Sequence, residues 1–83
     1  VEQEGKRAIG SFEKAIDEFK AVANDKALSD ALRSLGFFLR GQSQFADAFQ
    51  TFQQALELSL ESNNYDHALS SLNGIGLTLR DVG

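Results

Sequence analysis

The amino-acid sequence predicts an all-α fold built from stacked helical hairpins. Apolar residues recur with a helical period throughout, and no segment alternates as a strand does. Four apolar positions repeat at an offset of 33 residues. Phe12, Ala15, Phe19 and Val22 are followed at this offset by Phe45, Ala48, Phe52 and Ala55. Residues 72–80 also echo residues 32–40, at an offset of 40. Such periods are typical of helical arrays in which each unit buries its apolar face on a neighbour, and which usually serve as protein-binding surfaces.

Composition and charge narrow the class of protein. The 83 residues suffice for one small domain, and 42% hydrophobic with 24% charged residues favours a folded, soluble chain. The lack of cysteine excludes disulfides, and no apolar run approaches the roughly 18 residues of a membrane helix. A net charge of −4 disfavours nucleic acid as a partner. We therefore expect a cytoplasmic protein with no membrane or nucleic-acid partner, and its start at Val1 suggests part of a longer protein.

The first helix is expected over about residues 12–23. Ser11 can cap this helix, and Gly10 interrupts whatever precedes it. Residues 1–9 are charged and contain a further glycine, so we expect a frayed or partial helix there. Apolar residues at helical spacing form the inward stripe of the first helix: Phe12, Ala15, Ile16, Phe19 and Val22.

Two more helices are expected in the middle of the chain. Asn24 and Asp25 form a turn and cap a helix over about residues 26–40, with this stripe: Leu28, Ala31, Leu32, Leu35, Phe38 and Leu39. Residues 41–43 end that helix and cap the next one, over about residues 44–62. Its apolar residues are Phe45, Ala48, Phe49, Phe52, Ala55 and Leu56.

The last helix is expected over about residues 65–81. Two asparagines, Asn63 and Asn64, supply the turn before it. Its inward residues are expected to be Ala68, Leu69, Leu72, Ile75 and Leu79. The chain therefore has four main helices and no linker long enough to separate domains.

Residues 29–62 resemble one complete tetratricopeptide repeat. The family's small, large and aromatic packing positions hold matching residues: Ala31, Leu32, Leu35, Gly36, Phe45, Ala48, Phe52, Ala55 and Leu56. Residues 10–23 resemble the second helix of a repeat and residues 65–83 a first helix, while Ser43 replaces the usual loop glycine. The resemblance implies a right-handed α-solenoid of antiparallel helical hairpins over residues 10–83. The offset of 40 is similar to the longer-repeat branch found in signalling regulators and scaffolds.

The resemblance also implies a binding groove, because first helices of successive repeats in this family line a concave surface that holds peptides. Transferred to this chain, the groove positions are Arg33, Phe37, Arg40, Asn73, Leu77 and Arg80. Lys26, Arg33 and Arg40 recur every seven residues and share one helix face. We expect a partly basic groove with Phe37 and Leu77 as its floor, binding an extended acidic peptide of a partner protein. Alternatively, the last arginine of each helix only complements the helix C-terminus.

Residues that could carry chemistry are isolated in the sequence. His67 has Asp66 beside it but no second His or Cys at ligand spacing, so we expect a surface histidine and no metal site. No glycine-flanked serine follows a strand, and Gly74 and Gly76 lie in a helical stripe rather than in a phosphate loop. We therefore expect no enzyme, no cofactor and no catalytic residues.

A second interpretation makes self-association the function. Leu72, Ile75 and Leu79 lack the helix that would cover them in a complete repeat, and Phe12 and Phe19 lack a preceding one. These open faces predict a homodimer, formed by direct packing or by exchange of helices. A third interpretation, RNA recognition by helical repeats, is disfavoured by the acidic balance and the missing base-reading pattern.

Overall fold

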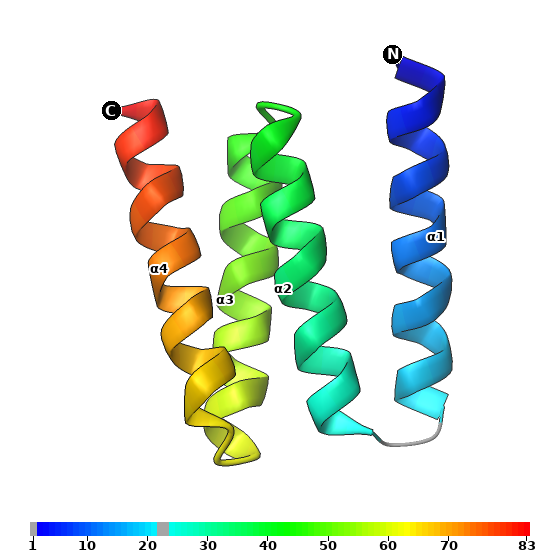
Figure 1. The fold of residues 1–83 in the computed structure, drawn as a ribbon, viewed down its shortest axis with the longest axis vertical. Coiled ribbons are helices and arrows are strands. Elements are labelled where there is room, and N and C mark those ends of the chain that lie inside the picture. Colours follow the sequence, from blue (N-terminus) through cyan, green and yellow to red (C-terminus); the bar gives the residue numbers. More distant parts are fainter. Residues whose placement is uncertain (1, 22–23) are drawn as a thin grey trace.

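The computed structural model describes residues 2–21 and 24–83. These residues form four α-helices: α1 (Glu2–Ala21), α2 (Asp25–Gly41), α3 (Phe45–Glu61) and α4 (Tyr65–Val82). None of the described residues lies in a strand, so the predicted all-α fold with four main helices is confirmed. Figure 1 shows the helices side by side, with the short connection between α2 and α3 at one end of the molecule and that between α3 and α4 at the other. The bounds of α2, α3 and α4 agree with the predicted ranges to within one residue.

The predicted break at Gly10 is wrong. Helix α1 runs without interruption from Glu2 through Gly10 and Ser11, so Ser11 lies inside the helix and cannot be its cap. A mid-helix glycine costs only about 1 kcal/mol relative to alanine. The side chains of Ile9 and Phe12, on either side of Gly10, pack against the core and keep the helix continuous. The expected frayed segment is therefore part of α1 from Glu2 onward, whereas Val1 and the predicted end at residues 22–23 lie outside the described residues.

Side-chain caps and left-handed turns set the remaining helix ends. Asn24 and Asn64 precede α2 and α4, and their side-chain oxygens accept hydrogen bonds from the backbone N–H groups of Ala27 and His67, at 3.1 and 3.4 Å. The turns after α2 and α3 each contain one residue with positive φ, Ser43 at 62° and Asn63 at 57°. Ser43 thus takes a conformation that normally favours glycine, the residue expected there from the repeat pattern.

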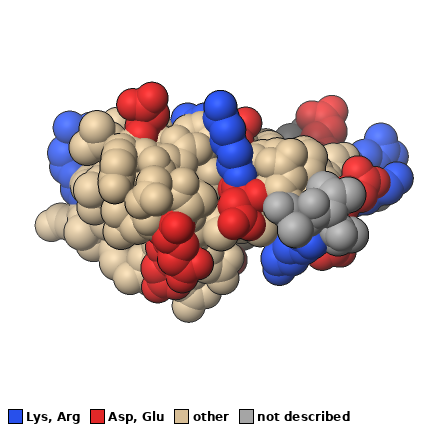
Figure 2. Space-filling model, turned by 90° about the horizontal axis from the view of Figure 1, so that it is seen from below, with Lys and Arg blue, Asp and Glu red and all other residues tan. Residues whose placement is uncertain are grey.

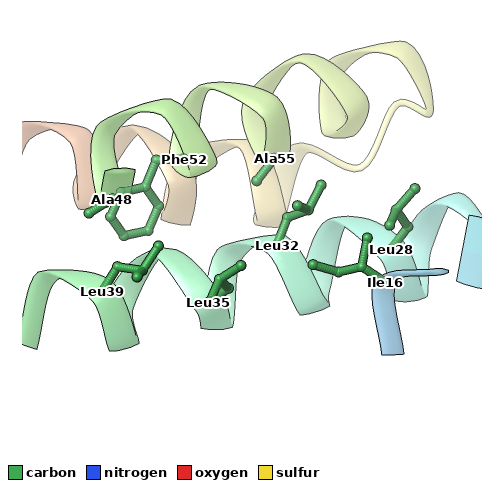
Figure 3. Packing of buried hydrophobic residues seen from close by; sticks show 8 residues of the cluster. All are labelled: Ile16, Leu28, Leu32, Leu35, Leu39, Ala48, Phe52 and Ala55. Carbon is green, nitrogen blue, oxygen red and sulfur yellow. The ribbon is translucent and has the colours of Figure 1, made fainter. Parts of the chain in front are cut away.

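The core lies between α2 and α3. Figure 3 shows four leucines of α2, at helical spacing, facing three residues of α3. They are Leu28, Leu32, Leu35 and Leu39 on α2, and Ala48, Phe52 and Ala55 on α3. Helix α1 adds Ile16 to this core. Phe52 is fully buried. A Cβ added to Gly36 of α2 or to Gly74 of α4 would lie only 2.7 or 2.5 Å from its ring. Both glycines therefore allow the Phe52 ring to fit between α2 and α4.

The inward face of α4 differs from the prediction. Residues buried on α4 are small or polar, namely Ala68, Ser71, Gly74 and Thr78, and Ile75 is half-buried. The predicted inward residues Leu69, Leu72 and Leu79 are instead 66%, 50% and 52% exposed. The physical reason is the volume of the Phe52 ring, which leaves room only for small side chains on the facing side of α4. Burial of Thr78 costs little because its hydroxyl donates to the Gly74 carbonyl, at 2.7 Å.

Candidate functional site

Helices α2 and α4 meet through side chains, and together they present the predicted groove residues. Three side-chain hydrogen bonds between described residues join the two helices: Ser29 with His67, Arg33 with Ser70, and Arg40 with Asp81. We call the face around these contacts the α2–α4 surface; its residues are Lys26, Asp30, Arg33, Phe37 and Arg40 on α2, and His67, Ser70, Asn73, Leu77, Arg80 and Asp81 on α4.

Arg33 is held by neighbours on both helices. Its Nη1 donates to the Ser70 hydroxyl at 3.2 Å, and its Nη2 pairs with the Asp30 carboxylate one turn earlier on α2. The Nε atom is buried and has no acceptor among the described residues. Arg33 therefore positions α4 against α2, and its charge already has a carboxylate partner.

Arg40 links the same helices near their C-terminal ends. Its Nε donates to Oδ2 of Asp81 at 2.6 Å, and both side chains are 28% exposed. An ion pair at this exposure contributes about 0.5–1 kcal/mol to stability. Arg40 thus bridges two helices in addition to lying in the last turn of α2, a contact that neither sequence interpretation of this arginine included.

The predicted apolar floor is only partly open to solvent. Phe37 is half-buried, and its ring meets the ring of Phe52 edge-on, with centroids 4.8 Å apart and planes at 75°. Leu77 is also half-buried, on the same face of α4 as Asp81. Phe37 therefore belongs to the α2–α4 surface and also covers the core, so it stabilises the fold whether or not it touches a ligand.

The remaining predicted site residues are exposed. Asn73 and Arg80 lie on the outer flank of the same α4 face. Lys26 lies at the N-terminal end of α2 and lines a pocket of about 360 Å³ together with Asn24, Ala27, Asp30 and His67. The structure thus brings Arg33, Phe37, Arg40 and Leu77 toward the junction and leaves the other three at its margins.

His67 is not the surface histidine expected from the sequence. Its side chain is only 17% exposed, because it lies between α4 and α2. Nδ1 is 2.7 Å from the Ser29 hydroxyl and 3.0 Å from the Asn64 side-chain nitrogen, and Nε2 is 4.0 Å from an Asp30 carboxylate oxygen. The Ser29 hydroxyl is also 3.0 Å from the carbonyl oxygen of Lys26. The Asn64 side-chain nitrogen can only donate, so its contact requires an unprotonated, accepting Nδ1. The single proton of the Ser29 hydroxyl goes either to Nδ1 or to the Lys26 carbonyl.

This grouping of serine, histidine and aspartate does not form a nucleophilic site. Ser29 has no exposed surface, so its oxygen cannot reach a substrate. Among the described residues, no group of three or more His, Asp or Glu side chains could hold a metal ion. The cluster instead joins the N-terminal ends of α2 and α4. The repeat offset of 40 residues was the sequence signal that α2 and α4 lie side by side. The three hydrogen bonds between these helices join residues that are 37–41 positions apart.

Comparisons with protein-family models, with curated proteins and with solved structures find no match to this chain. The tetratricopeptide resemblance therefore stays a prediction from the residues. In the part of the chain that the structure describes, no helix combines the length and apolar character needed to cross a membrane.

Proposed function

We propose that this chain is a protein-interaction module that holds an extended peptide of a partner protein on the α2–α4 surface. The proposal includes the tetratricopeptide-like architecture, a right-handed solenoid of antiparallel hairpins, in which α2 and α4 are the first helices of successive repeats. The observation that carries it is the junction itself. Two helices, joined by three side-chain hydrogen bonds, present Phe37 and Leu77 at positions 40 residues apart, with basic groups beside them.

The chemistry of the surface favours a peptide with one apolar and one acidic residue. An apolar side chain can cover the exposed parts of Phe37 and Leu77, and removing this apolar surface from water favours binding. Lys26 and Arg80 are exposed and have no ion pair among the described residues, so they are the cations open to a carboxylate. The Asn73 amide can bond to the peptide backbone.

Asp30 and Asp81 limit how acidic the peptide can be. They already pair with Arg33 and Arg40, and they place negative charge beside the proposed path of the peptide. A strongly acidic peptide would have to displace these intramolecular partners, whereas a single carboxylate at either end of the path meets Lys26 or Arg80 alone. We therefore expect affinity to peak at one or two acidic residues and to fall for longer acidic runs.

The test is binding of fluorescent peptides from an acidic-apolar library, measured by anisotropy. Asn73→Ala and Arg80→Ala change exposed side chains, so each should weaken binding about fivefold or more without affecting folding. Gln53→Ala and Gln54→Ala alter residues on α3 that are also exposed, and they serve as controls. Phe37→Ala is a poor probe because it also removes the contact with Phe52. Binding that is unchanged by both α4 variants would refute the proposed surface.

A further inference from the structure

The first and last helices, α1 and α4, each have an apolar side that no neighbouring described helix covers. By the internal repeat, α4 corresponds to α2, so Leu72 and Leu79 occupy the positions of Leu32 and Leu39. The α2 residues are 8% and 5% exposed because α3 covers them, whereas their α4 counterparts are 50% and 52% exposed. The same face of α4 also exposes Leu69 and Val82, at 66% and 60%. Among the described residues, no helix therefore covers this face of α4 in the way that α3 covers α2.

Helix α1 is the part of this chain that matches the covering helix. It corresponds to α3 at the offset of 33 residues, which places Ala15 and Phe19 at the positions of Ala48 and Phe52. Ala48 and Phe52 have no exposed surface because helices lie on both sides of them. Ala15 and Phe19 are only half-buried, since among the other described helices α1 packs against α2 alone. Helix α1 thus has an apolar side suited to one more helix.

A pocket lies between α3 and α4, beside the open face of α4. It has a volume of about 380 Å³ and is lined by residues of α3 and α4: Phe45, Ala46, Phe49, Gln50, Thr78, Leu79 and Val82. At the corresponding place between α1 and α2, the rings of Phe12 and Phe38 fill the space, with centroids 5.8 Å apart. Thr78 takes the position of Phe38 and is smaller, which leaves the pocket. Figure 2, which views the molecule from below, shows mostly uncharged side chains on the α3–α4 side, with charged groups at the edges of this area.

We propose that α1 of a second copy lies on the open face of α4, in the way that α3 lies on α2 within one copy. Phe19 of the second copy then packs against Gly76, as Phe52 packs against Gly36. Gly76 now has no atom within 4 Å of where a Cβ would be, so the space is present. The contact extends the interface between α2 and α3 to a second molecule, and it does not rest on the proposed peptide function.

The contact is head-to-tail, because it joins different surfaces of the two copies. Each added copy leaves one α4 face and one α1 face open, so assembly does not close at a dimer. The mean mass should therefore rise steadily with concentration from the 9.1 kDa monomer. Light scattering behind a sizing column, repeated up to the millimolar range, measures this. A monomer at every concentration overturns the proposal, and so does a dimer that never grows.

A glycine substitution tests the interface without damaging the monomer. Gly76→Gln adds a side chain where the monomer has open space but where Phe19 of the second copy must pack. Association should weaken by about tenfold or more, while helix stability does not fall. Gly10→Gln is the matched control, because Gly10 is also exposed, helical and free of neighbours, and lies on the side of α1 away from Phe19. Equal effects of the two variants on association overturn the proposal.

Mixing two blocked variants tests the direction of assembly. Leu79→Asp blocks only the α4 face and Ala15→Gln blocks only the α1 face, with folding of each checked by circular dichroism. Each variant alone should lose the concentration-dependent increase in mass, and an equimolar mixture should form a complex of one copy of each. If Ala15→Gln alone still dimerises fully, α4 pairs with α4 of the second copy and the head-to-tail assignment is wrong.

Discussion

The close approach of the Phe52 ring to α4 gives the sharpest prediction about stability. Gly74 and Gly76 lie on the same helix, two residues apart, but on opposite sides of it. A Cβ on Gly74 would lie 2.5 Å from the Phe52 ring, whereas a Cβ on Gly76 would meet nothing within 4 Å. Replacing each glycine with alanine therefore changes the helix backbone in the same way and the packing in opposite ways.

The two effects can be separated by magnitude. Alanine in place of a helical glycine stabilises a protein by about 0.5–1 kcal/mol. Overpacking a buried site costs about 1–3 kcal/mol, and the Phe52 ring has little freedom to move because Gly36 and Phe37 lie against it. The Gly76→Ala variant should therefore be more stable than the unchanged protein. The free energy of unfolding of the Gly74→Ala variant should be lower than that of the Gly76→Ala variant by about 1–3 kcal/mol. In a domain of this size that difference amounts to roughly 4–24 °C in Tm.

The assay is urea or thermal unfolding of both variants at low protein concentration, where self-association does not contribute. Phe52→Leu, alone and combined with Gly74→Ala, completes a double-mutant cycle. The smaller side chain should relieve the overpacking, so the coupling between the two positions should favour the double variant by about 1 kcal/mol or more. Equal stability of Gly74→Ala and Gly76→Ala, with no coupling to Phe52, would refute the packing of α4 described here.

Three further predictions concern single side chains. Ser43→Gly should raise the free energy of unfolding by about 0.5–1 kcal/mol, because φ is 62° there, and Ser43→Ala should not. Ser71→Ala should raise it by about 0.5–1 kcal/mol in thermal unfolding, because the buried Ser71 hydroxyl has no partner among the described residues. Arg40→Ala and Asp81→Ala should each cost about 0.5–1 kcal/mol and be non-additive, a coupling that high salt should reduce.

Helix positions could be read from the sequence because apolar spacing and turn residues agree there. Asn24 and Asn64 act as caps, and the stripe from Leu28 to Leu39 is the core face of α2. The start of α1 could not be predicted, since packing of Ile9 and Phe12 outweighs the weak helix preference of the glycine between them. Tertiary contacts decide such cases, and local propensity does not contain them.

The candidate surface was predictable in location but not in its contacts. The seven-residue spacing of Lys26, Arg33 and Arg40 places them on one side of α2, as expected. Their partners on α4 depend on how the two helices are offset along their axes, which no single helix pattern fixes. The role of His67 was missed for the same reason, because its contacts to Ser29 and Asp30 cross between helices.

Helix α4 has one side of large apolar residues and one side of small residues, and hydropathy alone selects the wrong one as the core side. The leucines outweigh Ser71, Gly74 and Thr78 in any apolar count, yet the small residues are buried, since they alone admit the Phe52 ring. Leu72→Gln with Leu79→Gln decides between the two orientations. If the leucines faced the core, each change would cost several kcal/mol, of the order of 2–5. Because they are half-exposed, we expect less than about 1 kcal/mol each in dilute unfolding experiments, together with loss of self-association. A cooperative loss of folding in the dilute double variant would place the leucines inside and contradict this orientation of α4.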